Sequence, residues 1–186
     1  MSKKLAVFID RDGTINQDVD NLSNLANLKL LPNTAQAILL LNQFKITAIV
    51  ITNQPVIARG LLDEKGVEKI HLEINNQIGR IGAKIDGFYF CPHHPKANLK
   101  KYRVTCICRK PGIGMYQQAA QDFGVDLTKS YVIGDSFRDI EAGKALDTTT
   151  IAVGSDQTNF RNSKPDYLVK DLYEAVKLLL KKEKLI

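Results

Sequence analysis

The stretch that decides the fold is KLAVFIDRDGTIN, residues 4–16. Residues 5–9 are all apolar, which predicts a strand buried inside a sheet. The run ends abruptly at Asp10 and Asp12, and Gly13 then lets the backbone turn away. Two carboxylates this close are costly to hold together unless a cation joins them, and parallel α/β sheets place their ligands at the carboxyl ends of such strands. The stretch therefore predicts a metal-dependent reaction site where the first strand ends.

The composition is that of an ordinary globular protein. The chain has 186 residues, of which 44% are hydrophobic and 25% are charged, so we expect one domain over residues 1–186 with a substantial core. It contains no run of about 18 apolar residues, which argues against a membrane span. Its first residues, MSKK, lead into the strand without the apolar core of a signal peptide. We therefore expect a cytoplasmic protein with no membrane partner.

The chain carries a formal net charge of +6, from 26 basic and 20 acidic residues. Such an excess suits an anionic small molecule, and it also suits nucleic acid. A zinc-loop nucleic-acid-binding protein is therefore an alternative of a different class. The basic residues, however, are spread along the chain without the interleaved aromatic residues on which bases stack, so we expect no nucleic-acid partner.

Beyond the first strand, apolar β-branched runs alternate with segments of helical periodicity. Such alternation is typical of an α/β fold with a parallel sheet and helices on both faces. Residues 16–33 and 55–62 are predicted as loops, and the first is long enough to be a binding loop or a lid. The expected strands cover residues 5–9, 46–52, 85–90, 130–135, 148–153 and 165–169, and the expected helices cover residues 33–44, 64–80, 115–123, 137–146 and 172–181.

Four short motifs at or near the predicted strand ends carry polar side chains. They are DRDGT (10–14), TNQ (52–54), CRKP (108–111) with its lysine, and GDSFRD (134–139). Together they resemble the four motifs of the haloacid dehalogenase (HAD) superfamily of phosphotransferases. The resemblance implies a three-layer, Rossmann-like parallel sheet of the HAD type. Neither GxxxxGK[ST] nor GxGxxG occurs, so nucleotide-dependent kinases and dinucleotide enzymes lack support.

The chemistry of these residue types agrees with phosphoryl transfer, which needs an in-line nucleophile, a cation and positioned donors. We expect Asp10 to attack phosphorus and form an aspartyl-phosphate, and Asp12 to act first as general acid and then as general base. Oxygen ligands from Asp10, the Asp12 carbonyl and Asp135 suit Mg²⁺. Asp139 has two interpretations, a helix-surface acid or a support for Lys110 or the metal. The expected phosphate- and substrate-binding residues are Thr52, Asn53, Gln54, Arg59, Arg109 and Lys110.

All three cysteines of the chain lie within 18 residues of one another. An odd number of cysteines without an export signal argues against disulfides. Two pairs of ligands with a spacing of two residues predict instead a closed, tetrahedral Zn²⁺ site. Zinc would hold residues 91–110 folded and would fix Arg109 and Lys110 at the active site. His94 falls outside the spacing and is expected at the surface or near the substrate. The expected zinc ligands are Cys91, His93, Cys106 and Cys108.

The cysteine and histidine pattern narrows the resemblance. FIDRDGTIN, TNQ followed by IARG, CPHHP and CICRKP are similar to the heptose bisphosphate phosphatases and the related histidinol-phosphate phosphatases, and the similarity spans essentially the whole chain. It implies Mg²⁺-dependent hydrolysis of a sugar phosphate by a monomer, with a small zinc loop and no large cap domain. For the heptose enzymes it implies removal of the 7-phosphate on the route to ADP- or GDP-heptose for lipopolysaccharide. Hydrolysis of histidinol phosphate or another small phosphoester is the alternative.

Three departures from the family pattern fall where the substrate should be recognised. Residues 20–23 read DNLS where the family usually has GYVH, Pro55 replaces a serine, and Ser136 stands where the heptose enzymes often carry a lysine. The loop over residues 16–33 is the expected specificity element. Arg59 and Arg109 are expected to meet a second phosphate or sugar hydroxyls.

Overall fold

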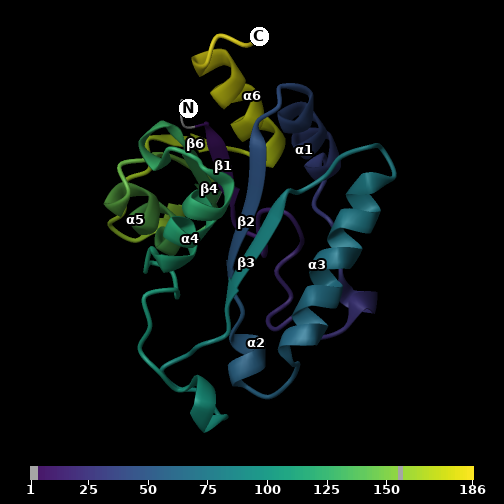
Figure 1. Cartoon of the computed structure of the whole chain (residues 1–186), viewed down its shortest axis with the longest axis vertical. Helices are drawn as coiled ribbons and strands as arrows, with labels where there is room; N and C mark the ends of the chain where they lie inside the picture. The colour runs from purple at the N-terminus through teal and green to yellow at the C-terminus, as the bar shows by residue number, and fades with distance from the viewer. Residues whose placement is uncertain (1–3, 155–156) are drawn as a thin grey trace.

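The computed structural model describes residues 4–154 and 157–186. Its strands form one parallel sheet in the order β3-β2-β1-β4-β5-β6, which runs through the middle of the molecule (Figure 1). The predicted α/β parallel sheet is confirmed, and each predicted strand overlaps an observed one. The strands are β1 (Ala6–Ile9), β2 (Thr47–Asn53), β3 (Gly87–Cys91), β4 (Tyr131–Gly134), β5 (Thr149–Val153) and β6 (Tyr167–Val169).

Helices cover both faces of the sheet and complete three layers. They are α1 (Thr34–Gln43), α3 (Glu64–Gly79) and α6 (Leu172–Lys182) on one face, and α4 (Gly114–Phe123) and α5 (Phe137–Ala145) on the other. Val7 and Ile9 of β1 pack under the first set, and Ala6 and Phe8 pack under the second. Because successive side chains of a strand point to opposite faces, the unbroken apolar run of β1 contributes to both halves of the core. In the described part of the chain, no helix combines the length and the apolar character needed to cross a membrane.

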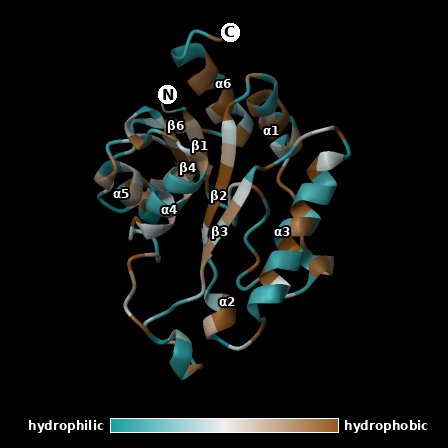
Figure 2. Ribbon diagram, in the orientation of Figure 1, coloured by the Kyte–Doolittle hydropathy of each residue, from teal (hydrophilic) through white to brown (hydrophobic). Residues whose placement is uncertain are grey.

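Local sequence signals set the ends of these helices. The Asp63 carboxylate accepts a hydrogen bond from the Gly66 backbone N–H at 2.7 Å, and aspartate is one of the residue types that favour such an N-cap position. Asp171 caps α6 in the same way through Glu174, and Gly124 ends α4 with a left-handed φ of 63°. Figure 2 shows α3 with both teal and brown residues along its length, as expected for a helix with one buried side.

The structure differs from the prediction between residues 55 and 62. The expected loop contains α2 (Pro55–Ala58), a single helical turn with Pro55 at its first position. Proline is tolerated there because the first N–H of a helix has no partner within the helix. The loop prediction is therefore wrong for these four residues, since one turn is too short to leave a periodic pattern. The long loop over residues 16–33 is confirmed, with a short 3₁₀ turn at Leu25–Asn27.

The sheet order brings the ends of β1 and β4 together. β1 pairs with β2 on one side and with β4 on the other, so the connections that leave β1 and β4 run in opposite directions and open a crevice at their carboxyl ends. Asp10 follows β1, and Asp135 follows β4. The fold therefore places two carboxylates from distant parts of the chain at the same crevice.

Replacement of Ile74 by alanine should lower the free energy of unfolding by about 2–5 kcal/mol, because this residue of α3 is completely buried in the core. The matched control is Leu72→Ala on the same helix, where 63% of the residue is exposed, and the expected change is within about 0.5 kcal/mol. Urea unfolding followed by circular dichroism measures both. Equal losses in the two variants would contradict the packing of this face of α3 on the sheet.

Candidate active site

The buried ammonium of Lys110 lies at the centre of the site. Its Nζ donates to Asp10 Oδ1 at 2.7 Å, to Asp139 Oδ1 at 2.6 Å and to the Ile51 carbonyl at 2.7 Å. Only 2% of the Lys110 side chain is exposed. Burial lowers the pKa of this amine, but the Asp10 and Asp139 carboxylates outweigh burial and raise the pKa above its usual value. Lys110 is therefore a charged group inside the protein.

Three carboxylates converge beside this lysine. One oxygen from each of Asp10, Asp135 and Asp139 lies within 4.8 Å of the other two. Burial and the neighbouring acids raise the pKa of Asp10, against the opposing charge of Lys110. Burial and the Asp139 charge raise the pKa of Asp135 to about 6. Because carboxylates at this distance repel one another unless a cation is present, the donor set fits a hard divalent cation such as Mg²⁺.

Gly13 allows the end of β1 to approach Asp135. Its φ is +83°, and a Cβ at this position would lie 2.1 Å from Asp135 Oδ2. A larger residue would be strained in this backbone conformation and would displace the carboxylate. A glycine is therefore required at this position for two reasons: the backbone turn and the close approach of the Asp135 carboxylate.

The Asp12 side chain belongs to a second hydrogen-bond network. Arg11 Nη2 donates to both Asp12 oxygens at 2.8 Å, and Asn16 Nδ2 and Gln54 Nε2 donate to them at 2.9 and 2.8 Å. Burial raises the pKa of Asp12, but the Arg11 charge and these hydrogen bonds outweigh burial and hold the pKa below its usual value. Asp12 is therefore ionised in this arrangement, while its neighbour Asp10 has a raised pKa.

The residues of the TNQ motif hold other groups of the site in place. Asn53 Oδ1 accepts from the Lys110 backbone N–H at 2.9 Å, and Asn53 Nδ2 donates to the Lys110 carbonyl at 3.1 Å. Gln54 is 98% buried, and its Nε2 also donates to Thr52 Oγ1 at 2.9 Å. Thr52, Asn53 and Gln54 border the same cavity as Asp10. The side-chain amides of Asn53 and Gln54 therefore hydrogen-bond to protein groups in this structure.

Asp139 is buried, with 1% of the residue exposed, which excludes its interpretation as a helix-surface acid. Besides Lys110, its partner is Ser136, whose Oγ donates to Asp139 Oδ2 at 2.7 Å. Ser136 stands where the heptose enzymes often carry a lysine. In this chain the serine orients the carboxylate that holds Lys110.

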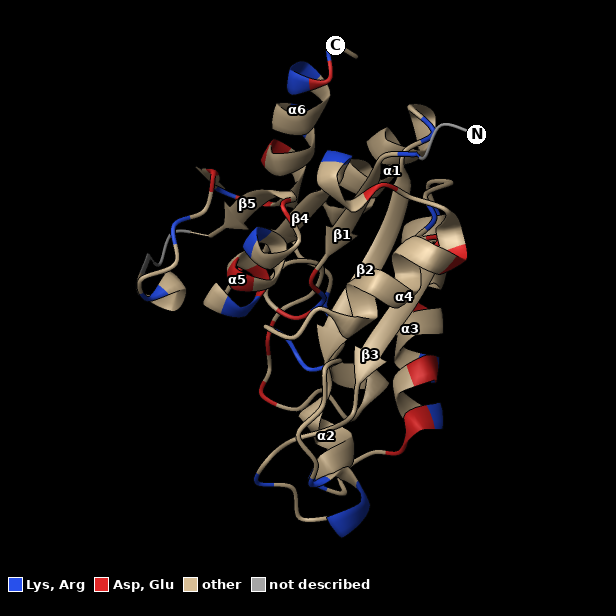
Figure 3. Ribbon diagram, turned by 60° about the vertical axis from the view of Figure 1, so that its left-hand side comes forward, with Lys and Arg blue, Asp and Glu red and all other residues tan. Residues whose placement is uncertain are grey.

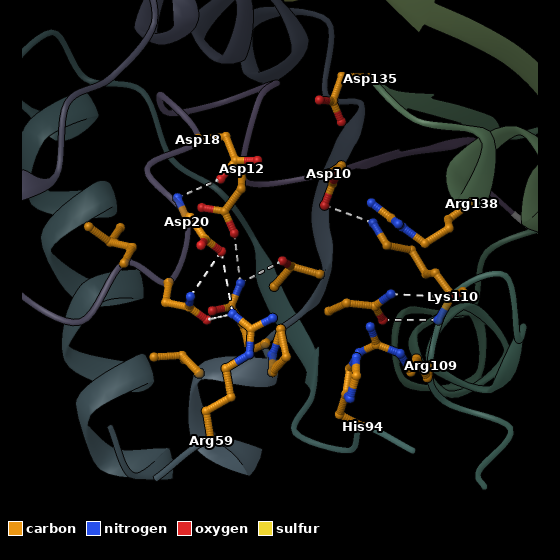
Figure 4. A pocket seen from close by; sticks show the side chains of 17 residues that line it. Asp10, Asp12, Asp18, Asp20, Arg59, His94, Arg109, Lys110, Asp135 and Arg138 are labelled. Atoms are coloured by element: carbon orange, nitrogen blue, oxygen red, sulfur yellow. Dashed lines mark hydrogen bonds and ion pairs between the residues drawn. The ribbon is translucent and has the colours of Figure 1, made fainter. Parts of the chain in front are cut away.

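A cavity of about 330 Å³ opens beside these groups. Figure 4 shows Asp10 and Asp135 at one end of the cavity and Arg59, Arg109 and His94 toward the other end, while Lys110 reaches Asp10. A cation on the acidic side and an anion on the basic side would each meet complementary charge. The acidic lining residues are Asp10, Asp12, Asp18, Asp20 and Asp135, and the basic ones are Arg59, Arg109, Lys110 and Arg138, together with His94.

Arg59 connects the loop over residues 16–33 to the segment that follows α2. Its Nη1 donates to Asn21 Oδ1 and lies 3.4 Å from Asp20 Oδ1. Asp20 and Asn21 adopt positive φ angles of 37° and 68°, which these residue types tolerate better than most. Two residues of the unusual DNLS segment therefore hold an arginine that borders the cavity.

The four predicted zinc ligands come together. The Sγ–Sγ distances among the three cysteines are 3.0, 3.1 and 3.6 Å, and His93 Nδ1 lies 3.3 Å from Cys108 Sγ and 3.7 Å from Cys91 Sγ. The cysteines are free thiols and form no disulfide. Sulfur ligands at about 2.3 Å from a tetrahedral Zn²⁺ lie about 3.7 Å apart, so the set fits zinc with small adjustments. His94 is outside the set, and its Nδ1 accepts from the Lys96 backbone N–H.

The segment over residues 91–110 connects this cluster to the cavity. Ala97 and Tyr102 pack against Val56 and Ile57 of α2, and Arg109 Nη1 donates to the His93 carbonyl at 2.9 Å. Figure 3 shows basic residues in blue at the lower end of the molecule, near α2. The segment therefore brings His94, Arg109 and Lys110 to the cavity from one folded unit.

Sequence reasoning missed several residues of the site. Arg11 and Asn16 hold Asp12, and Asp18 and Arg138 border the cavity. The available signal for Arg11 was its position between two carboxylates, and for Arg138 its position inside the fourth motif. Nothing in the sequence marked Asn16, because its contact with Asp12 depends on how the loop after β1 turns back.

Comparison with known protein sequences agrees with this geometry. A family model described as HAD-hydrolase-like matches residues 107–175. The D-glycero-beta-D-manno-heptose-1,7-bisphosphate 7-phosphatase of Rhodopseudomonas palustris is 42% identical over 143 residues, which are 77% of this chain and 79% of that protein. The enzyme of the same name from Escherichia coli strain K12 is 30% identical over 182 residues, 96% of this chain and 95% of that protein.

Solved structures give the same picture. The D,D-heptose 1,7-bisphosphate phosphatase from B. bronchiseptica, complexed with magnesium and phosphate, has a TM-score of 0.82 and 32% identity, and the match covers 96% of this chain and 99% of that one. A putative HAD-like phosphatase from Mesorhizobium loti has a TM-score of 0.82 and 30% identity, with coverages of 95% and 88%. These relatives support the phosphatase interpretation over the nucleic-acid-binding alternative.

Cys106→Ser should lower the zinc content from about one ion per chain, because it removes one thiolate from a four-ligand site. The matched control is Ile107→Ser, since Ile107 lies between two of the cysteines and is 76% exposed. Atomic absorption on protein purified without chelator measures the ratio of zinc to chain. Protein that contains no zinc, or an equal loss in the control, would contradict the four-ligand set.

Mg²⁺ should bind more weakly as the pH falls below about 6. The pKa of Asp135 is about 6, so at lower pH a proton must leave before this carboxylate can bind a cation. The apparent dissociation constant should rise steadily as the pH falls below that value, and the raised pKa of Asp10, the second carboxylate ligand, acts in the same direction. Titration calorimetry at several pH values measures it. A constant independent of pH would contradict a role of Asp135 as ligand.

Proposed function

The chain belongs to the HAD-like phosphatase family that includes the D-glycero-beta-D-manno-heptose-1,7-bisphosphate 7-phosphatases, and from this membership we propose that it removes the 7-phosphate of that heptose bisphosphate. It is a phosphoric monoester hydrolase. The observation that carries the proposal is the convergence of Asp10, Asp135 and Lys110 at one cavity, in a chain 42% identical to a curated enzyme of this activity. The product would feed the synthesis of ADP- or GDP-heptose for lipopolysaccharide.

Asp10 is the proposed nucleophile. Its carboxylate attacks phosphorus, the bond from phosphorus to the sugar oxygen breaks, and an aspartyl-phosphate forms. Lys110, whose Nζ lies 2.7 Å from Asp10 Oδ1, supplies positive charge where negative charge develops on the phosphoryl oxygens. Asp10, the Asp12 carbonyl and Asp135 would hold Mg²⁺, which neutralises the phosphoryl oxygens when bound.

Asp12 is the proposed general acid and base. Because Asp12 is ionised in the free site, it must first take up a proton, which a phosphate ester brings when it binds as the monoanion. In the first step Asp12 passes this proton to the sugar oxygen as that oxygen leaves with the bonding electrons. In the second step the same carboxylate takes a proton from water, the water oxygen attacks phosphorus, and the bond to Asp10 breaks to release phosphate. The two roles are supported by the different side-chain partners of the two carboxylates. Asp10 accepts from the Lys110 ammonium, whereas Asp12 accepts from the Arg11 guanidinium and the Gln54 amide.

The basic side of the cavity supports a substrate with a second phosphate. Arg59, Arg109 and Arg138 all border it, and arginine binds phosphate oxygens through two parallel N–H groups. Histidinol phosphate, the other substrate considered, would present a cationic amine to these three guanidinium groups. The charge of the cavity therefore favours the bisphosphate.

We also infer a structural Zn²⁺ held by Cys91, His93, Cys106 and Cys108. The support is the convergence of these four ligand atoms within one segment and the hydrogen bond from Arg109 to the His93 carbonyl. A zinc ion there would order the segment that carries Arg109 and Lys110.

The proposal is tested by phosphate release from a panel with Mg²⁺: the heptose bisphosphate, histidinol phosphate and para-nitrophenyl phosphate. The heptose bisphosphate should give the highest kcat/KM, and Asp10→Asn should reduce turnover by at least about 10³-fold, since it removes the nucleophile without changing its size. The matched control is Asp147→Asn, an exposed position with a φ of 55° that asparagine accepts. Turnover that survives Asp10→Asn would remove the proposed nucleophile, and preference for histidinol phosphate would remove the proposed substrate.

A further inference from the structure

Arg11 is the largest completely buried side chain in the described part of the chain. It stands between Asp10 and Asp12 in the first motif, yet 0% of it is exposed, so its guanidinium cannot be reached from water. A buried cation without partners would be very costly. The guanidinium must therefore be stabilised by its partners inside the protein. These partners are Asp12, Gln54 and His71.

The guanidinium forms hydrogen bonds to the Asp12 carboxylate through two of its nitrogens. Arg11 Nε donates to Asp12 Oδ1 at 3.1 Å, and Nη2 donates to Oδ1 and Oδ2 at 2.8 Å. Such a fork fixes the plane of a carboxylate as well as its position. Asn16 Nδ2 adds a hydrogen bond to Oδ1, and Gln54 Nε2 adds one to Oδ2. Asp12 therefore has one orientation that all its partners share.

A second layer holds Arg11 itself. Gln54 Oε1 accepts from Arg11 Nη2 at 3.0 Å, and His71 Nε2 lies 3.5 Å from Arg11 Nη1. His71 is 96% buried on α3 and stacks on Phe88, with ring centroids 4.6 Å apart and an interplanar angle of 15°. Burial and the Arg11 charge lower the pKa of His71 to about 3, so the imidazole is neutral and can face the cation without repulsion.

We propose that Arg11 is a positioning residue for the phosphatase reaction: supported by His71 and Gln54, it holds the Asp12 carboxylate in the orientation from which a proton passes to the leaving oxygen. This inference rests on the proposed function and adds to it a buried network that reaches from the first motif to α3. Arg11 acts through Asp12, because its burial keeps it from touching the substrate.

The role predicts a dependence on the leaving group. The first step breaks the bond from phosphorus to the substrate oxygen, whose electron pair needs the Asp12 proton when that oxygen is a basic alkoxide. A weakly basic leaving group such as para-nitrophenolate departs without that proton. Since kcat/KM reports the steps up to departure of the leaving group, a misplaced Asp12 should reduce it for basic leaving groups only. Loss of an orientation of this kind costs up to about 100-fold.

The experiment compares kcat/KM for para-nitrophenyl phosphate, phenyl phosphate and an alkyl phosphate in the unaltered enzyme and in three variants. Arg11→Met should lower the alkyl phosphate value by about 10- to 100-fold, with a change of less than about threefold for para-nitrophenyl phosphate. Arg11→Lys should resemble it, because an ammonium keeps the charge but cannot form the fork. His71→Phe, which keeps the aromatic ring on Phe88, should shift the ratio in the same direction by about 3- to 10-fold.

The matched control is Ile74→Ala, which destabilises α3 one turn after His71 without touching Asp12. It should leave the ratio of the two kcat/KM values unchanged. Thermal unfolding shows which variants fold. If Arg11→Met does not fold, His71→Phe still tests the inference.

Equal losses on every substrate in the Arg11 and His71 variants would show a merely structural role and overturn the inference while the phosphatase function stands. Full rescue by Arg11→Lys would overturn it too, because charge alone would then suffice. An unaltered enzyme that hydrolyses neither these three esters nor the heptose bisphosphate would instead remove the proposed function, and the inference with it.

Discussion

The arrangement of the site depends on one buried cation, the Lys110 ammonium between Asp10 and Asp139. Three charged groups taken out of water separately would each cost several kcal/mol, and the lysine offsets much of that cost for both acids at once. Its position is fixed at both ends, since Asn53 binds its backbone and the Ile51 carbonyl accepts from its Nζ. The end of β2 therefore determines where the positive charge lies relative to β1 and α5.

The first motif separates two carboxylates that the sequence places side by side. Burial and neighbouring acids raise the pKa of Asp10, whereas Arg11 and two amide donors keep the pKa of Asp12 low. Environments that shift the pKa values of two neighbouring acids in opposite directions are typical of sites where the acids have different catalytic roles. Gly13 completes the arrangement, because only a residue without a Cβ leaves room for Asp135 beside the turn.

The segment over residues 91–110 carries both the cysteine and histidine cluster and two basic residues of the cavity. It has few buried apolar residues of its own: apart from the proposed ligand Cys91, they are Ala97 and Tyr102, which pack against α2. Without a cross-link such a segment would gain little from burial against the entropy of ordering its backbone. A zinc ion held by the three thiols and one imidazole would provide that cross-link next to Arg109 and Lys110.

The sequence by itself determined the sheet, the ends of several helices and the convergence of the acids, because apolar periodicity, caps and short motifs are local properties of the chain. Asp63 and Gly124 show this for helix ends, and Asp10 with Asp135 shows it for strand ends. Only the tertiary structure decided which partner each polar group has. Arg11 looked like an ordinary charge between two acids, and Asp139 could have been a surface acid, until folding buried both. The physical reason is that burial and long-range hydrogen bonds depend on residues such as His71 and Gln54, which the sequence keeps far from Arg11 and which only α3 and β2, packed in the same fold, bring to it.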